Sequence, residues 1–96
     1  MNMNLLTERA RDIQNIERCL LTHQNKKEEL RAELWINTDF ATELEKPKPT
    51  EKDKDAYVRS NKEYKELNEN IAKCKSKLDY EIRMFDICFN EKYNRQ

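Results

Sequence analysis

The chain has 96 residues, of which 40% are charged and 36% hydrophobic, and its formal net charge is zero. A chain this small and polar can form one domain but not a thick core, which favours an elongated helical shape. The absence of glycine excludes glycine-rich phosphate-binding loops, and the interspersed acids and bases give no overall basic stripe of the kind that nucleic-acid-binding proteins carry.

Residues 4–35 are predicted to form a first helix. Apolar residues there follow the seven-residue spacing of a coiled-coil seam, the line of positions that faces a partner helix. Three polar residues, Arg9, His23 and Lys27, interrupt this seam and restrict the pairing register. The apolar seam residues are Leu6, Ile13, Ile16, Leu20, Leu30 and Leu34.

Residues 36–50 are predicted to form the bend of a hairpin. Thr38 or Asp39 can cap a short helical turn that ends at Leu44, and the spacer EKPKP follows it. Three apolar side chains are expected to pack over the start of the second helix and close this end of the hairpin: Trp35, Phe40 and Leu44.

Residues 51–93 are predicted to form one long second helix. Pro47 and Pro49 block helix before it, and Thr50 can act as its N-cap. Glu51 and Asp53 then place negative charge on the free amides of the first turn. The residues of the second seam are Tyr57, Tyr64, Leu67, Ile71, Cys74, Leu78, Phe85 and Cys88, with Ser60 and Glu81 as polar members.

The fold class that follows is all-α: an antiparallel two-helix hairpin, coiled-coil-like, forming a single domain over residues 1–96. The preferred register places Ile16 opposite Ile71, so that Lys27 meets Ser60. A register shifted by one heptad, with the first helix continuing into FATEL at residues 40–44, is also permitted. Because two helices that touch along one seam bury little surface, the hairpin is expected to form a homodimer as a helical bundle.

The stretch LDYEIRMFDICF, residues 78–89, is apolar over most of the helix circumference. In the preferred register Leu6 lies opposite Glu81, so the second helix overhangs the first from Ile82 onward. An exposed apolar end of this kind marks an interface. A heptad shift, or a Met1–Leu6 segment that folds back, would instead cover this end within the monomer. The predicted interface residues are Tyr80, Ile82, Met84, Phe85, Ile87, Cys88 and Phe89.

Catalytic patterns are not found, and the chain is predicted not to be an enzyme. Cys19 and His23, four residues apart, share one helix face, and Cys74 lies across the hairpin. A metal site or a thiolate–imidazole pair is conceivable there, but ordinary packing of small hydrophobic thiols and a seam histidine is preferred. The prediction is therefore no catalytic residue, no metal and no cofactor.

The sequence also bears on location. A run of about 18 apolar residues that could span a bilayer is not found, nor is a basic segment followed by an apolar one at the start of the chain. An odd number of cysteines without a CxxC pair fits reduced thiols. A cytoplasmic location with no membrane contact is expected.

The string TDF at residues 38–40, followed by PTEKDKDAYV at residues 49–58 and a long heptad helix, resembles small uncharacterised proteins from early regions of phages and prophages of low-GC Gram-positive bacteria. The resemblance implies a setting in the bacterial host cytosol and transfers no activity. In that setting the expected function is a non-enzymatic protein–protein interaction module that binds and modulates a host or phage protein, such as an inhibitor of a host defence or replication system.

The alternative is a nucleic-acid-binding accessory protein of phage replication or recombination. The second helix carries a local excess of lysine, and nearby tyrosines can stack on unpaired bases. Because acids alternate with these lysines, nucleic-acid binding is the less favoured function. The lysines concerned are Lys62, Lys65, Lys73, Lys75 and Lys77.

Overall fold

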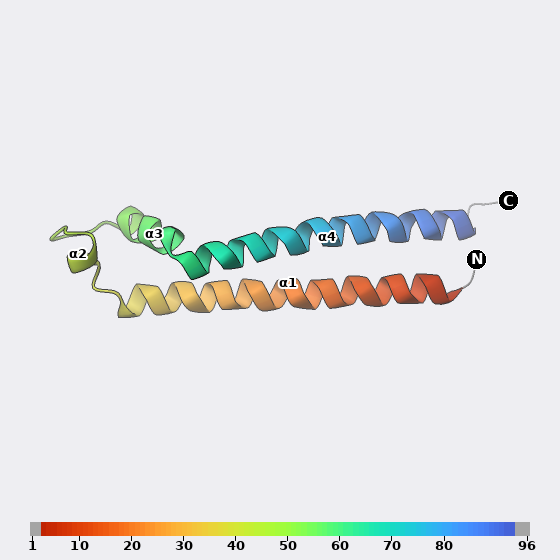
Figure 1. Ribbon diagram of the computed structural model, residues 1–96, viewed down its shortest axis with the longest axis horizontal. Helices are drawn as coiled ribbons and strands as arrows, with labels where there is room; N and C mark the ends of the chain where they lie inside the picture. The colour runs from red at the N-terminus through yellow and green to blue at the C-terminus, as the bar shows by residue number, and fades with distance from the viewer. Residues whose placement is uncertain (1–2, 94–96) are drawn as a thin grey trace.

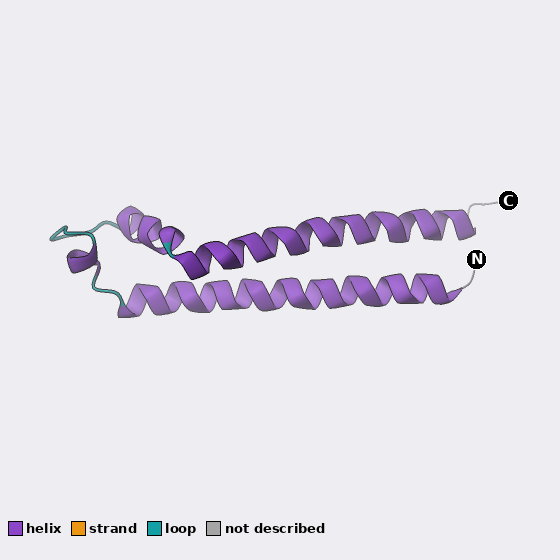
Figure 2. Cartoon of the chain, in the orientation of Figure 1, coloured by secondary structure: helices purple, strands orange, loops and turns teal. Residues whose placement is uncertain are grey.

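The computed structural model describes residues 3–93, and the described residues form an all-helical hairpin (Figure 1). Two long helices lie side by side and antiparallel, and two short helices form the bend (Figure 2). The molecule is a rod of 71 × 17 × 16 Å. The predicted all-α hairpin is confirmed, while residues 1–2 and 94–96 of the predicted domain lie outside the described residues. The helices are α1 (Met3–Asn37), α2 (Phe40–Glu43), α3 (Glu51–Ser60) and α4 (Lys62–Tyr93).

The hydrophobic core is a single narrow line between the helices. Among the residues whose burial the structure describes, only Val58 has a side chain that is almost fully enclosed, with 2% of its surface exposed. A core this thin leaves little apolar burial per residue to offset the conformational entropy of the chain. The buried apolar residues of the described chain are Leu6, Ile16, Phe40, Val58, Tyr64, Leu67, Ile71 and Cys88.

Helix α2 is a single turn with a complete set of caps. The Asp39 carboxylate accepts hydrogen bonds from the backbone N–H and the hydroxyl of Thr42, which identifies Asp39 as the N-cap. At the other end, the N–H of Glu45 donates to the Thr42 carbonyl and that of Lys46 to the Ala41 carbonyl, the pattern of a Schellman motif. Glu45 adopts the left-handed conformation at φ 53°, a position that most helices give to glycine.

Helix α3 begins where the sequence predicted. The Thr50 hydroxyl accepts a hydrogen bond from the Asp53 N–H at 3.2 Å, and the Asp53 carboxylate accepts one from the Thr50 N–H at 3.0 Å. This reciprocal capping box satisfies two amides that the first turn leaves without helical partners. Lys46 adds an ion pair to Asp53, with Nζ and Oδ1 3.1 Å apart, and so links the end of α2 to the start of α3.

The predicted continuous helix over residues 51–93 is wrong in one respect, because the helix breaks at Asn61. The backbone of Asn61 is extended, at φ −63° and ψ 132°. Its N–H donates to the Val58 carbonyl and ends α3, while its side-chain oxygen accepts from the Tyr64 N–H at 3.0 Å and caps α4. One asparagine therefore ends one helix and starts the next, and α3 lies at an angle to α4 (Figure 1).

Aromatic rings close the bend, as the sequence predicted. Phe40, with 5% of its surface exposed, contacts the ring of Trp35 edge-on at 5.8 Å and that of Tyr57 at 5.5 Å between centroids. The ammonium group of Lys54 lies 5.6 Å from the Trp35 ring and 5.5 Å from the Phe40 ring, a cation–π arrangement. Leu44, also predicted in this cluster, is half-buried. This cluster ties α1, α2 and α3 together.

The preferred register is wrong, because the contacts between α1 and α4 are displaced from it by three to six residues, toward the alternative shifted by one heptad. Ile16 lies with Lys77 in a groove between α1 and α4 instead of facing Ile71. Lys27 contacts Tyr64 instead of Ser60. Seven-residue spacing alone permits alignments one heptad apart, because each alignment keeps the same apolar lines facing one another. Helix α1 nevertheless ends at Asn37 and does not continue into residues 40–44.

Candidate functional site

The predicted interface residues lie on the last four turns of α4, but the expected overhang is wrong. Helix α1 starts at Met3, and Leu6 is buried, as is Cys88 on α4. The shifted register thus covers one side of the α4 end within the monomer. Cys88 is consequently an intrachain core residue, with 8% of its surface exposed. Met84 and Phe85 are half-buried, and the exposed members of the set are Tyr80 (60%), Ile82 (40%), Ile87 (50%) and Phe89 (44%).

The exposed and half-buried apolar side chains at this end form two separate faces of α4. At 100° per residue, Tyr80, Met84 and Ile87 fall within about 60° of one another around the helix axis. Ile82, Phe85 and Phe89 fall within a similar arc on the nearly opposite side. We name this second set, Ile82, Phe85 and Phe89, the phenylalanine face. The α1-facing residues Glu81 and Cys88 lie between the two faces, which explains why the sequence is apolar nearly all round.

The phenylalanine face carries an ordered ring pair. The rings of Phe85 and Phe89 are stacked, with centroids 6.3 Å apart and an interplanar angle of 23°. These residues are one helical turn apart, so the stack runs along the helix surface. Phe85 is half-buried beside α1 while Phe89 has 44% of its surface exposed, and the face therefore extends from the hairpin interior to the surface.

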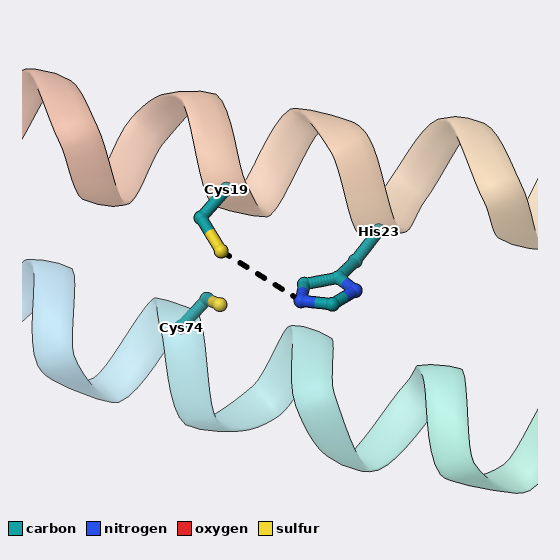
Figure 3. Close-up of side chains that lie close together, drawn as sticks. All are labelled: Cys19, His23 and Cys74. Carbon is teal, nitrogen blue, oxygen red and sulfur yellow. Dashed lines mark hydrogen bonds between the residues drawn. The ribbon is translucent and has the colours of Figure 1, made fainter.

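A second cluster, of two cysteines and one histidine that could bind a metal ion, lies in the middle of the hairpin. Cys19 and His23 project from α1 toward Cys74 of α4, and the three side chains meet between the helices (Figure 3). The Cys19 sulfur and His23 Nε2 are 3.8 Å apart, and the ligand atoms of all three residues lie within 4.8 Å of one another. The sequence indicated these three residues as candidates for a metal site or a thiolate–imidazole pair, and the structure brings all three together.

Burial and the charge of Lys77 act in opposite directions on the pKa of the Cys74 thiol. Burial, with a smaller contribution from the neighbouring Cys19 thiol, raises the pKa of Cys74 above its ordinary value of 9.0. The nearby ammonium group of Lys77 acts in the other direction and favours the thiolate. The cluster opens onto a groove of about 230 Å³ lined by Asn15, Ile16, Cys19, Cys74 and Lys77. Solvent and small ions therefore have access to the sulfur atoms.

The contact between Arg9 and Glu81 was not predicted from the sequence. Arg9 Nη1 lies 3.6 Å from the Glu81 carboxylate, and both side chains are mostly buried, with 24% and 18% exposed. Each residue is a polar interruption of its own seam. The preferred register placed Leu6 opposite Glu81, whereas the ion pair places Arg9, three residues further along α1, beside that carboxylate.

The basic residues considered for nucleic-acid binding are all exposed on α4. Glu63, Glu66, Glu69 and Asp79 occur among them on the same helix and are exposed as well. The mixture of signs weakens any local positive potential. The lysines are Lys62, Lys65, Lys73, Lys75 and Lys77.

Comparisons with protein-family models, with curated proteins and with solved structures find no match to the chain. Among the described residues, no helix contains an apolar run long enough to cross a membrane. The fold defines the class of protein as an all-α helical hairpin.

Proposed function

We propose that the chain is a non-enzymatic interaction protein that associates through the phenylalanine face at the end of α4. The observation that carries this proposal is the exposure of Ile82 at 40% and Phe89 at 44%, beside the stacked, half-buried Phe85. Large aromatic side chains anchored in a helix surface are the residues from which interface hot spots are made. Their clustering within three turns of one helix supports an interface over scattered surface hydrophobes.

The first binding partner that we propose for the phenylalanine face is a second copy of the same chain. The core of the hairpin is one line of side chains, so burial of additional apolar surface stabilises the fold by a route that the monomer lacks. The zero net charge means that two copies do not repel one another at long range. Pairing the phenylalanine faces of two hairpins about a two-fold axis would place α4 against α4 in a four-helix bundle.

In the phage setting that the sequence resemblance implies, the same surface serves to engage a host or phage protein in the bacterial cytosol. Catalysis has no part in this proposal, because binding energy from the apolar face suffices to sequester or redirect a partner. Exchange of the second copy for a partner protein would be a direct way to regulate such an interaction, since the two compete for one face.

Light scattering coupled to size-exclusion chromatography tests the proposal. At concentrations from micromolar upward, the expected mass is twice the 11.7 kDa of one chain. Dilution should shift the mass toward the monomer, because association through a small apolar face is concentration-dependent. A monomer mass throughout the series contradicts the proposal.

A further inference from the structure

We propose that Cys19, His23 and Cys74 form a zinc-binding site that joins α1 to α4. The sequence alone favoured ordinary packing for these three residues. The geometry of the folded chain reverses that preference. The inference is independent of the proposed self-association, because the cluster lies in the middle parts of α1 and α4 and the phenylalanine face lies near the end of α4.

The distances are close to those of a tetrahedral metal site. Zinc binds thiolate sulfur at about 2.3 Å and imidazole nitrogen at about 2.0–2.1 Å, so two such ligands at a tetrahedral angle are roughly 3.6 Å apart. The Cys19 sulfur and His23 Nε2 are 3.8 Å apart, and the full set of ligand atoms lies within 4.8 Å. Side-chain movements of less than about one ångström per ligand, on the order of thermal motion, complete the geometry.

The secondary structure already fixes the directions of the ligands. Cys19 and His23 are separated by four residues, which places both on one face of α1. Cys74 approaches from α4, and the Nε2 atom of His23 points toward the two sulfur atoms (Figure 3). The other ring nitrogen, Nδ1, is buried with no hydrogen-bond partner among the described residues, which leaves Nε2 as the nitrogen available to a metal ion.

The donor set selects the metal. Two thiolates and one imidazole are soft or borderline ligands, which favour zinc over magnesium or calcium. Zinc binding would displace the thiol protons and form two sulfur–metal bonds and one nitrogen–metal bond, with no change of oxidation state. Three protein ligands leave a fourth position, which the groove lined by Asn15 and Lys77 opens to a water molecule.

Titration of the reduced full-length chain with Zn²⁺ and with Co²⁺ tests this site. The expected result is saturation at one metal ion per chain and, for Co²⁺, the thiolate charge-transfer absorption that reports sulfur ligation. The thermal unfolding midpoint should rise on Zn²⁺ addition, because the ion binds only the folded arrangement of ligands from two helices. Absence of saturable uptake overturns the proposal.

Matched variants assign the ligands. Cys19→Ser, His23→Gln and Cys74→Ser should each reduce Zn²⁺ affinity by at least about 100-fold, more than the loss of an outer-shell partner. Cys88→Ser, at a buried cysteine outside the cluster, should retain one ion per chain. Cys19 is exposed, so Cys19→Ser leaves the core intact and tests the ligand even where a buried variant fails to fold. Equal metal loss in Cys88→Ser overturns the assignment.

Two further outcomes distinguish an intrachain zinc site from a metal shared between copies and from a disulfide. Phe89→Asp, a substitution on the phenylalanine face and outside the Cys19, His23 and Cys74 cluster, should bind one Zn²⁺ per chain as the wild type does. Loss of metal binding in that variant would place the metal between copies and overturn the intrachain site. Formation of a Cys19–Cys74 disulfide without reductant, together with no metal uptake in its presence, would also overturn the proposal and assign the pair to thiol oxidation.

Discussion

The ammonium group of Lys27 lies over the ring of Tyr64, with Nζ 5.4 Å from the ring centroid. The contact joins α1 to the start of α4 at a position where the sequence shows only an interruption of an apolar seam. Lys27 is half-buried and Tyr64 is buried. The aliphatic stem of the lysine can therefore pack in the seam while its charge is placed on an aromatic face.

This contact should appear as a coupling energy between the two residues. Lys27→Met keeps the length of the side chain and removes the charge, and Tyr64→Leu removes the ring. Each variant should unfold at lower urea concentration, and a double-mutant cycle should give a coupling of about 0.5–1 kcal/mol. Additive effects of the two substitutions would show that the lysine packs without an electrostatic contribution from the ring.

The left-handed backbone at Glu45 predicts an order of stability at that position. Asparagine tolerates this conformation better than glutamate, so Glu45→Asn should raise the free energy of unfolding by about 0.5 kcal/mol. Glu45→Val should lower it by about 1 kcal/mol or more, because a β-branched residue is a steric outlier at positive φ. Chemical denaturation measures both, and Lys48→Val, in the same loop at negative φ, should change stability little.

The capping box predicts a substitution effect on α3. Thr50→Ala removes the side-chain oxygen that accepts from the Asp53 N–H, and should lower the free energy of unfolding by about 1 kcal/mol. Thr50→Ser keeps the oxygen and serves as the matched control. Equal destabilisation by the two variants would mean that the methyl group, and not the cap, matters at this position.

The decrease in the free energy of unfolding at acid pH should depend on Asp53. The Thr50 backbone hydrogen bond, with a further contribution from Lys46, lowers the pKa of Asp53 below its ordinary value of 3.8. The carboxylate therefore contributes stability that is fully present above pH 3.8 and is lost as the pH falls through the lower pKa of the folded state. Asp53→Asn should be less stable than the wild type at neutral pH, and the difference should shrink in acid. A difference that stays constant down to the acid transition would exclude this linkage.

The helical hairpin could be predicted because its signals are local. The heptad spacing of Leu6, Ile13 and Leu20, the prolines before Thr50 and the capping residues each act over a few positions, and the structure follows them. The register depends instead on contacts between distant segments. Asn61 carries no strong signal, because asparagine occurs within helices as well as at caps, yet it ends α3 and caps α4.

The candidate site was predictable to different degrees. The composition of residues 78–89 indicated an apolar end, but whether Cys88 was exposed or buried depended on the register and could not be read from spacing. The three ligand residues Cys19, His23 and Cys74 could be grouped from helix periodicity and an antiparallel arrangement. Their approach to within 4.8 Å required the true register, since a shift of one turn would move Cys74 by about 5.4 Å along the seam.

The two apolar faces at the end of α4 offer a direct test of which one associates. Phe89 and Ile87 are two residues apart, on nearly opposite sides of the helix, and their exposed fractions are similar at 44% and 50%. Substitution of either by aspartate introduces the same charge at nearly the same distance from the helix end. The pair therefore separates the effect of a face from the general effect of a charge.

Phe89→Asp should convert the dimer to a monomer, because a carboxylate at the centre of an apolar contact is desolvated without a partner. Ile87→Asp should leave the dimer mass unchanged, and so should Leu21→Asp on α1, where the wild-type side chain is 57% exposed. Light scattering gives the masses, and far-UV circular dichroism should show equal helical signal in all three variants. Adding Phe85→Asp to Phe89→Asp should deepen the loss of association. If Ile87→Asp is a monomer and Phe89→Asp remains a dimer, the interface is instead the face formed by Tyr80, Met84 and Ile87.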